Sequence, residues 1–237
     1  MGQLRILEDP AAVAQGAAGM IAQRIAAGLG RGGRFSLALS GGRTPVDTYR
    51  ALARGPVGPA QWRQVEIYFA DERAVPPDDP ESNYRLVRET LIEPAGIPPR
   101  NVHRIRAEDP DLEAVVRQAE MALAPVLDLI VLGIGEDGHI ASIFPGSPTA
   151  REAVARLVVV HDSPKPPPRR VTITPRVLRE AREIVLLATG AGKAEAVARA
   201  LEGTTDPDRC PARLVREREW LLDRAAAGLL AQSACPD

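Results

Sequence analysis

The chain has 237 residues, of which 45% are hydrophobic and 26% charged, and its net charge is −1. The near-zero net charge argues against a broad surface for nucleic acid or for an anionic membrane. No apolar run approaches the roughly 20 residues of a membrane-spanning helix, and the N-terminal sequence lacks the pattern of a signal peptide. Cys210 and Cys235 have no His or Cys neighbour at metal-ligand spacing, so no metal site is expected. We therefore expect a cytoplasmic protein that binds neither nucleic acid nor a membrane.

Short apolar runs alternate with amphipathic or alanine-rich stretches along the chain. Helices are predicted at residues 10–29, 45–54, 82–92, 111–123 and 192–201. Strands are predicted at residues 35–40, 65–70, 128–133, 157–160, 171–174 and 184–188. Several of these strands are continuously apolar, which is typical of a sheet with helices on both faces. The alternation predicts a single α/β domain over residues 1–237, with a doubly wound, mostly parallel sheet.

The first candidate site is the loop between the strand at 35–40 and the next helix. Its residues are Ser40, Gly41, Gly42, Arg43, Thr44 and Pro45. Paired glycines let backbone N–H groups approach an anion, and the N-terminus of the helix adds further donors. The loop is too short for a nucleotide-binding phosphate loop. It predicts a site for one phosphate, or else an ordinary turn, with Thr44 as the cap of the helix and Pro45 as its first residue.

Three charged residues, Asp71, Glu72 and Arg73, follow the next predicted strand. Ligands bind at the carboxyl ends of strands in open α/β sheets, so Arg73 is a candidate to hold a phosphate or a developing oxyanion. Asp71 or Glu72 would then hold Arg73 in place. A solvated charged turn is the alternative. Asn83 lies at the start of the helix that follows; the surface is its favoured place, with the same crevice as the alternative.

Residues 133–147 read GIGEDGHIASIFPGS and follow another apolar strand. This loop contains His139, one of three histidines in the chain, two residues after Asp137. The ordinary pKa of a histidine, about 6.5, suits proton transfer near neutral pH. The glycine-rich exit from a strand favours a catalytic role for His139, with a structural histidine as the alternative.

Two later segments carry basic residues. Residues 163–170 read SPKPPPRR and predict a stiff surface loop that ends in two arginines. Lys193 follows a Gly-Ala-Gly turn at the N-terminus of a predicted helix, where the helix dipole disfavours a cation. A bound anion would explain this lysine, and an exposed lysine is the alternative. Because the candidate loops leave strands of one parallel sheet, we expect them to meet at one edge of that sheet.

Five stretches of the sequence together resemble the family of 6-phosphogluconolactonases and glucosamine-6-phosphate deaminases. They are LALSGGRTP, ADERAVPPDDPESNYRLVRETL, LIVLGIGEDGHIASIFPGS, RRVTITP and TGAGKAEAV. With the closing EWLLDRAAAGLL they span nearly the whole chain. The resemblance implies a Rossmann-like fold and the hydrolysis of 6-phospho-D-glucono-1,5-lactone to 6-phospho-D-gluconate, the second step of the oxidative pentose phosphate pathway. A lactone is reactive enough to need no metal, so we expect no cofactor.

The resemblance also assigns residues by position. It makes His139 the catalytic histidine, Arg73 and Lys193 basic substrate contacts, and Arg170 a further one. It places Ser40, Gly41 and Gly42 in the phosphate loop. We expect His139 to act as a general base on water, with Asp137 orienting the imidazole or stabilising its charged form. Arg73 and backbone N–H groups are candidates for the oxyanion. The sugar-phosphate lactone is the only partner that we expect, and the protein is expected to be a monomer.

Two other functions are open at this point. Ile140 replaces the threonine that the lactonases usually have, as in the deaminases. The deaminases, however, typically continue with Phe-Asn-Glu-Pro, whereas Phe144 stands here in place of their glutamate, and Arg73 in place of their tyrosine. These differences favour the lactonase over a deaminase-like isomerase. A non-catalytic sugar-phosphate-binding domain of a regulator would need a DNA-binding segment, for which we expect no room before residue 35.

Overall fold

The computed structural model describes residues 2–231 of the chain. Its main sheet has six strands, each parallel to its neighbours, in the order β1-β9-β8-β5-β2-β3. Their bounds, in that order, are Leu4–Leu7, Glu219–Asp223, Glu183–Ala188, Leu129–Gly133, Phe35–Leu39 and Val65–Phe69. The central strands are buried along nearly their whole length, as strands covered on both faces are. The predicted α/β fold with a mostly parallel sheet is confirmed.

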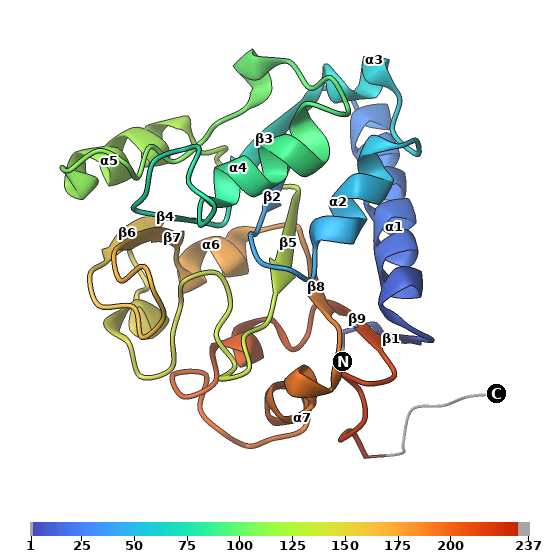
Figure 1. Ribbon diagram of the computed structural model, residues 1–237, viewed down its shortest axis with the longest axis vertical. Coiled ribbons are helices and arrows are strands. Elements are labelled where there is room, and N and C mark those ends of the chain that lie inside the picture. The colour runs from blue at the N-terminus through green and yellow to red at the C-terminus, as the bar shows by residue number, and fades with distance from the viewer. Residues whose placement is uncertain (1, 232–237) are drawn as a thin grey trace.

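Helices lie on both sides of this sheet (Figure 1). On one side are α1 (Pro10–Gly30), α2 (Val46–Ala53) and α3 (Pro59–Trp62), and on the other is α6 (Pro175–Glu180). The helix predicted at 82–92 is α4 (Asn83–Val87), continued by a π-helical turn, Arg88–Ile92. The remaining helices are α5 (Leu112–Ala122) and α7 (Ala194–Leu201).

A second, antiparallel sheet pairs β4 (Asp71–Arg73) with β7 (Arg170–Ile173) and β7 with β6 (Leu157–Val160). The strands expected at 157–160 and 171–174 therefore exist but do not join the parallel sheet, and Asp71–Arg73 is a strand and not a turn. Ala70 is where the chain changes sheets: its N–H donates to Leu39 of β2, and its carbonyl accepts from Ile173 of β7. The β4–β7 register sets Arg73 opposite Arg170.

Besides β4 and short 3-10 turns, two strands and two α-helices were not predicted from the sequence: β1, β9, α3 and α6. Strand β1 is an edge of the main sheet and β9 is its neighbour. Strand β9 is buried, but it begins with Glu219 and ends with Asp223, so its sequence does not read as an apolar run. One continuous hydrophobic core contains side chains from both sheets. Cys210 is a buried free thiol, whereas Cys235 lies outside the described residues. Within residues 2–231, no helix has the length and apolar character to cross a membrane.

Candidate active site

The carboxyl ends of β2 and β5 lie side by side where the strand order of the main sheet changes direction. From β2 the chain proceeds to β3 on one side, whereas β5 is followed by β8 and β9 on the other. Such a switch point leaves a crevice that binds ligands in α/β proteins. A cavity of about 370 Å³ opens there. Its lining includes Ser40, Gly41, Gly42, Arg43, Thr44, Arg73, His139, Arg170 and Lys193.

His139 and Asp137 form a hydrogen-bonded pair at the end of β5. Nδ1 of His139 lies 2.5 Å from Oδ1 of Asp137. The loop is a tight turn, in which Gly135 and His139 are joined by a backbone hydrogen bond of 2.8 Å. Gly135 has to be glycine, since a Cβ atom there would lie 2.0 Å from Nδ1 of His139. The imidazole of His139 therefore packs closely against the backbone of Gly135, which fixes the position of the ring.

The charge of Asp137 is secured by its surroundings. Burial raises the pKa of Asp137, but the hydrogen bonds with His139 and the nearby charge of Lys165 outweigh burial and hold that pKa well below its usual range. The ionised carboxylate accepts the proton on Nδ1 of His139. In the neutral imidazole this leaves Nε2 as the acceptor, which is the arrangement that a general base requires.

Phe144 packs against the other side of the histidine loop. Its ring centroid lies 4.7 Å from that of His139, and the Arg170 guanidinium lies 5.5 Å from the same phenyl centroid. Phe144 is buried. The imidazole is thus held between a carboxylate and an apolar ring.

The loop after β2 presents an unsatisfied donor to the cavity. Ser40 is 4% exposed, and its hydroxyl has no hydrogen-bond partner among the described residues. Gly41 allows a close approach, because a Cβ atom there would lie 1.8 Å from Oδ1 of Asn83. The expected cap is wrong: α2 begins at Val46 without a side-chain cap, because the chain first makes a turn in which the Val46 N–H donates to the Arg43 carbonyl.

Lys193 reaches the cavity from the loop after β8. Both carboxylate oxygens of Asp223, at the end of β9, accept from the N–H of Gly190 and fix the start of this loop. Burial lowers the pKa of Lys193; Glu136 and Asp137 counteract this, whereas Lys165 and Arg43 add to it. Three cations therefore share one electrostatic environment, which an anion would relieve.

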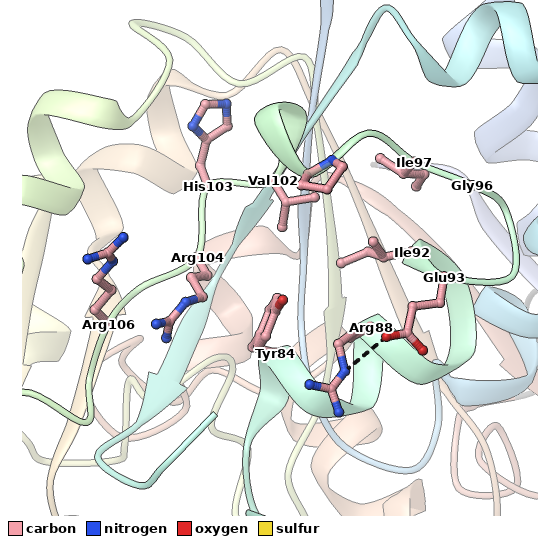
Figure 2. Close-up of a pocket in the computed structure, with 11 residues that line it drawn as sticks. Tyr84, Arg88, Ile92, Glu93, Gly96, Ile97, Val102, His103, Arg104 and Arg106 are labelled. Carbon is pink, nitrogen blue, oxygen red and sulfur yellow. Dashed lines mark ion pairs between the residues drawn. The ribbon is translucent and has the colours of Figure 1, made fainter. Parts of the chain in front are cut away.

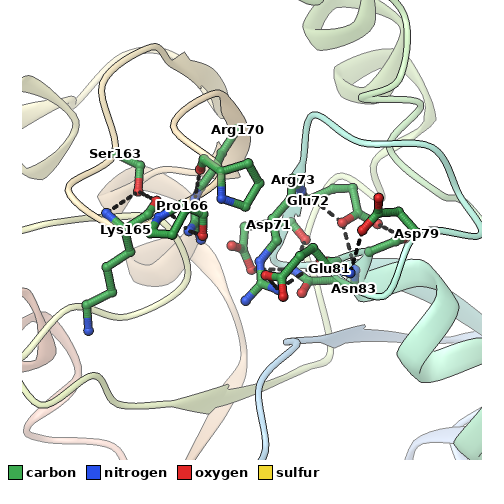
Figure 3. A network of polar contacts seen from close by, with 12 residues as sticks. Asp71, Glu72, Arg73, Asp79, Glu81, Asn83, Ser163, Lys165, Pro166 and Arg170 are labelled. Atoms are coloured by element: carbon green, nitrogen blue, oxygen red, sulfur yellow. Dashed lines mark hydrogen bonds and ion pairs between the residues drawn. The ribbon is translucent and has the colours of Figure 1, made fainter.

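Arg73 is held by Glu81, and not by Asp71 or Glu72 as expected. Its Nη1 donates to the carboxylate of Glu81 at 2.9 Å and to the carbonyl of the same residue at 2.8 Å (Figure 3). Glu72 is unavailable because it caps α4: it accepts from the backbone N–H groups of Arg73, Asn83 and Tyr84. Nε of Arg73 is buried without a partner among residues 2–231.

Asn83 lies in the cavity lining, so its expected place at the surface is wrong. Its side-chain amide donates to the carbonyl (2.9 Å) and to the carboxylate (3.2 Å) of Asp71. Asp71 in turn accepts from the Ser142 hydroxyl at 2.6 Å. Capping of α4 by Glu72 turns Asn83 inward, and no local feature of the sequence signals this. Asp71, Asn83 and Ser142 thus connect β4, α4 and the loop after β5 beside the cavity.

Arg170 is buried as the first residue of β7 and is not the exposed end of a loop, as the sequence suggested. Its guanidinium donates to the carbonyls of Lys165, Pro166 and Pro167 at 3.0–3.1 Å (Figure 3). Lys165, which the sequence analysis did not single out, also lines the cavity. The only signal for it was a lysine within a proline-rich segment.

A second cavity, of about 450 Å³, lies beside α4 (Figure 2). It is lined by three arginines, Arg88, Arg104 and Arg106, together with His103 and Tyr84. Arg104 forms two contacts of 2.7 and 3.0 Å with Glu108, and Arg88 lies 3.5 Å from Glu93. Since carboxylates already compensate Arg88 and Arg104, the second cavity is the weaker candidate despite its size.

The chain was compared with known proteins. Residues 8–222 match the family described as glucosamine-6-phosphate isomerases/6-phosphogluconolactonase. The chain is 40% identical to the 6-phosphogluconolactonase of Rattus norvegicus, over 97% of this chain and 94% of that protein. The structure of 6-phosphogluconolactonase from Trypanosoma brucei has a TM-score of 0.87 at 29% identity, covering 98% of this chain and 99% of that one. A monomeric glucosamine-6-phosphate deaminase has a TM-score of 0.81 at 26% identity, covering 96% and 99%.

Proposed function

Because the chain belongs to the glucosamine-6-phosphate isomerase/6-phosphogluconolactonase family, we propose that it hydrolyses 6-phospho-D-glucono-1,5-lactone to 6-phospho-D-gluconate. One observation carries the proposal: His139, which is paired with Asp137, lines the same cavity as a cationic, glycine-rich loop. A sugar phosphate has an anionic end and a reacting end. A site for it needs an anion cradle and a base a fixed distance apart.

The phosphate is bound by the loop after β2 and by Lys193. The loop offers backbone N–H groups and the unpartnered hydroxyl of Ser40. Arg43 and Thr44 line the same side of the cavity. Arg73 has Nε without a partner and serves either the phosphate or the developing oxyanion. Binding the phosphate fixes the lactone ring against His139.

The chemistry is general-base hydrolysis. Nε2 of His139 takes a proton from water while Asp137 holds Nδ1, and the water oxygen bonds to C1 of the lactone as the carbonyl electrons move onto the carbonyl oxygen. When this intermediate collapses, the bond from C1 to the ring oxygen breaks. His139 then returns its proton to the ring oxygen. General-base catalysis of this kind contributes about 10²–10⁴ in rate.

The deaminase alternative is favoured by Ile140, by the shared family and by overall fold similarity. In the deaminases that the sequence resembles, a glutamate occupies the position of Phe144. Here the phenyl ring contacts the imidazole, so the carboxylate that supports ring opening is replaced by an apolar group. We therefore expect no ammonia from glucosamine 6-phosphate, which a coupled ammonia assay would test.

The direct test is His139→Ala, with His103→Ala as the matched control. His103 is also paired with a carboxylate, Glu66, but lies outside the proposed site. We expect His139→Ala to lower kcat on freshly prepared lactone by at least roughly 100-fold, the lower end of the general-base range. His103→Ala should keep the wild-type kcat. Near-full activity in His139→Ala would refute the proposed role.

We also propose that the enzyme works in the cytoplasm. We propose further that it is a monomer, because side chains of one chain supply both the anion loop and the base. Sedimentation of the active enzyme at assay concentration would test the oligomeric state. A dimer as the only active species would contradict it.

A further inference from the structure

We propose that Lys165 is a further catalytic residue, whose ammonium group binds the carbonyl oxygen at C1 as that oxygen becomes negative. The inference rests on the proposed lactonase function. Lys165 lies in the loop between β6 and β7, well separated in sequence from the histidine loop, and the sequence analysis gave it no role. Three observations support it: how the loop is anchored, what the ammonium contacts, and which end of the cavity it occupies.

The loop that carries Lys165 is held rigidly. Ser163 donates through its hydroxyl to the Lys165 carbonyl at 2.7 Å and accepts from the Lys165 N–H at 3.1 Å. The Ser163 N–H donates to the Pro168 carbonyl at 2.9 Å, which closes the turn. Arg170 adds a contact to the Lys165 carbonyl at 3.0 Å. Every polar group around the base of Lys165 is thus engaged in fixing it.

The anchor of this loop is also in contact with the histidine loop. Arg170 packs on Phe144, and Phe144 packs on His139. Nη1 of Arg170 also lies 3.4 Å from the hydroxyl of Ser142. One buried guanidinium therefore sets where Lys165 and His139 stand relative to each other. Burying an arginine is unfavourable unless its donors are used, and here they are used to position a loop over the site.

The ammonium itself is available to a ligand. Nζ of Lys165 lies 3.8 Å from Oδ1 of Asp137, the same oxygen that contacts Nδ1 of His139. This distance allows an ion pair but is too long for a hydrogen bond. In the described part of the chain the Lys165 ammonium makes no hydrogen bond, and its side chain is 44% exposed at the cavity. All three N–H donors can turn to a substrate.

The position next to Asp137 decides which end of the substrate Lys165 meets. Lys165 and His139 contact the same carboxylate oxygen and line the same cavity, so the ammonium group lies on the His139 side of that cavity, where the reacting end of the substrate is placed. A donor there gains strength as the carbonyl oxygen becomes an oxyanion, and such differential binding raises kcat and not only affinity. Lys165 stays protonated throughout: it donates a hydrogen bond and exchanges no proton in the reaction.

The test replaces Lys165 by Met, which keeps the length of the side chain and removes the charge. Arg169→Met is the matched control, because Arg169 is an exposed cation of the same loop. We expect Lys165→Met to lower kcat by about 10²–10³, as the loss of one oxyanion donor does, with KM nearly unchanged. Arg169→Met should match the wild type. An increase in KM with unchanged kcat would instead assign Lys165 to the phosphate and overturn the inference.

Chemical rescue separates catalysis from a folding defect. Alkylation of a Lys165→Cys variant with 2-bromoethylamine rebuilds an ammonium of nearly the same length, and it should restore most of kcat; treated wild type is the control for the other cysteines. Failure of rescue, or wild-type kcat in Lys165→Met, would refute the role of Lys165 alone. If wild-type protein fails to hydrolyse the lactone, the proposed function itself fails, so the two failures are distinguishable.

Discussion

The active-site cavity and the second cavity beside α4 contain similar groups but differ in how those groups are paired. Each has a histidine in contact with a carboxylate: His139 with Asp137 at 2.5 Å, and His103 with Glu66 at 2.7 Å. Each also has several cationic side chains in its lining. Residue types alone therefore do not distinguish them.

The two cavities differ in which of their cationic side chains have a carboxylate partner. In the second cavity Glu66 also pairs with Arg34, and the ring of His103 stacks on Tyr68 at 4.6 Å. Two of the arginines, Arg88 and Arg104, have glutamate partners. In the first cavity, no ion pair of Arg43 or Lys193 is found within residues 2–231, and the Ser40 hydroxyl there has no partner. Lys193 is partly buried and, among these residues, without a carboxylate partner, which is unfavourable unless a ligand uses its charge, so the smaller cavity is the better anion site.

The largest effect on kcat should come from replacing the carboxylate that pairs with His139, and not from replacing the one that pairs with His103. Asp137→Asn removes the charge that stabilises the imidazolium and introduces an amide donor that can face Nδ1 and favour the wrong tautomer. We expect kcat to fall by about two orders of magnitude or more, as in other hydrolases with this arrangement. Glu66→Gln, the matched change in the second cavity, should leave kcat unchanged. Steady-state kinetics on both variants would decide, and equal losses would invalidate the comparison.

The next effect is on the free energy of unfolding and its dependence on pH, to which the buried carboxyl group of Glu72 contributes. Burial raises the pKa of Glu72 from 4.5 to about 7, against the lowering effect of three backbone N–H donors. The folded protein thus binds this proton more tightly than the unfolded chain. Its contribution is fully present below about pH 4.5, is lost as the pH rises to about 7, and amounts to about 3 kcal/mol.

Urea unfolding on both sides of that pH window would measure this contribution. In Glu72→Gln the free energy of unfolding should lack this decline, so the difference between variant and wild type changes with pH. A constant difference across the window would contradict a raised pKa for Glu72. Because other titrating groups are common to both proteins, they cancel in the subtraction.

The parts of the site that the sequence predicted are those that depend on residues close together in the chain. Glycines and charges at the ends of β2, β5 and β8 signalled their loops, and parallel pairing brings such loops together without further information. The positions of Ser40, His139 and Lys193 in one cavity confirmed the expected common edge.

What the sequence could not predict depends on contacts between distant residues. Ser142 and Asp71 meet across 71 positions, and Asn83 turns inward because Glu72 caps its helix. The placement of Arg170 depends on antiparallel pairing of β4 with β7, which an apolar run of four residues does not reveal. Local patterns specify loops and strands, whereas side-chain networks between loops arise only in the fold.

A smaller effect should follow from removing one uncompensated cation. Lys193→Met deletes a charge-assisted contact to the phosphate, which contributes about 1.5–3 kcal/mol and corresponds to an increase of roughly 10- to 100-fold in KM. Because this contact is made in ground and transition state alike, kcat should change little. Inorganic phosphate should also inhibit the variant less than the wild type. A collapsed kcat with unchanged KM would exclude the phosphate assignment.

The smallest effect should come from the second cavity. Arg104→Met removes the pair with Glu108 and a guanidinium 5.5 Å from the Tyr84 ring, contacts that together contribute about 1 kcal/mol or less at a partly exposed position. Unfolding by urea should show that loss, and kcat/KM should equal that of the wild type. Helix α4 connects the two cavities, because Tyr84 lines the second cavity and Asn83 lines the first. The carboxylate of Glu72 accepts from the backbone N–H groups of both residues. A clear fall in kcat/KM would mean that α4 transmits changes to the active site, and that compensated charge does not exclude a functional cavity.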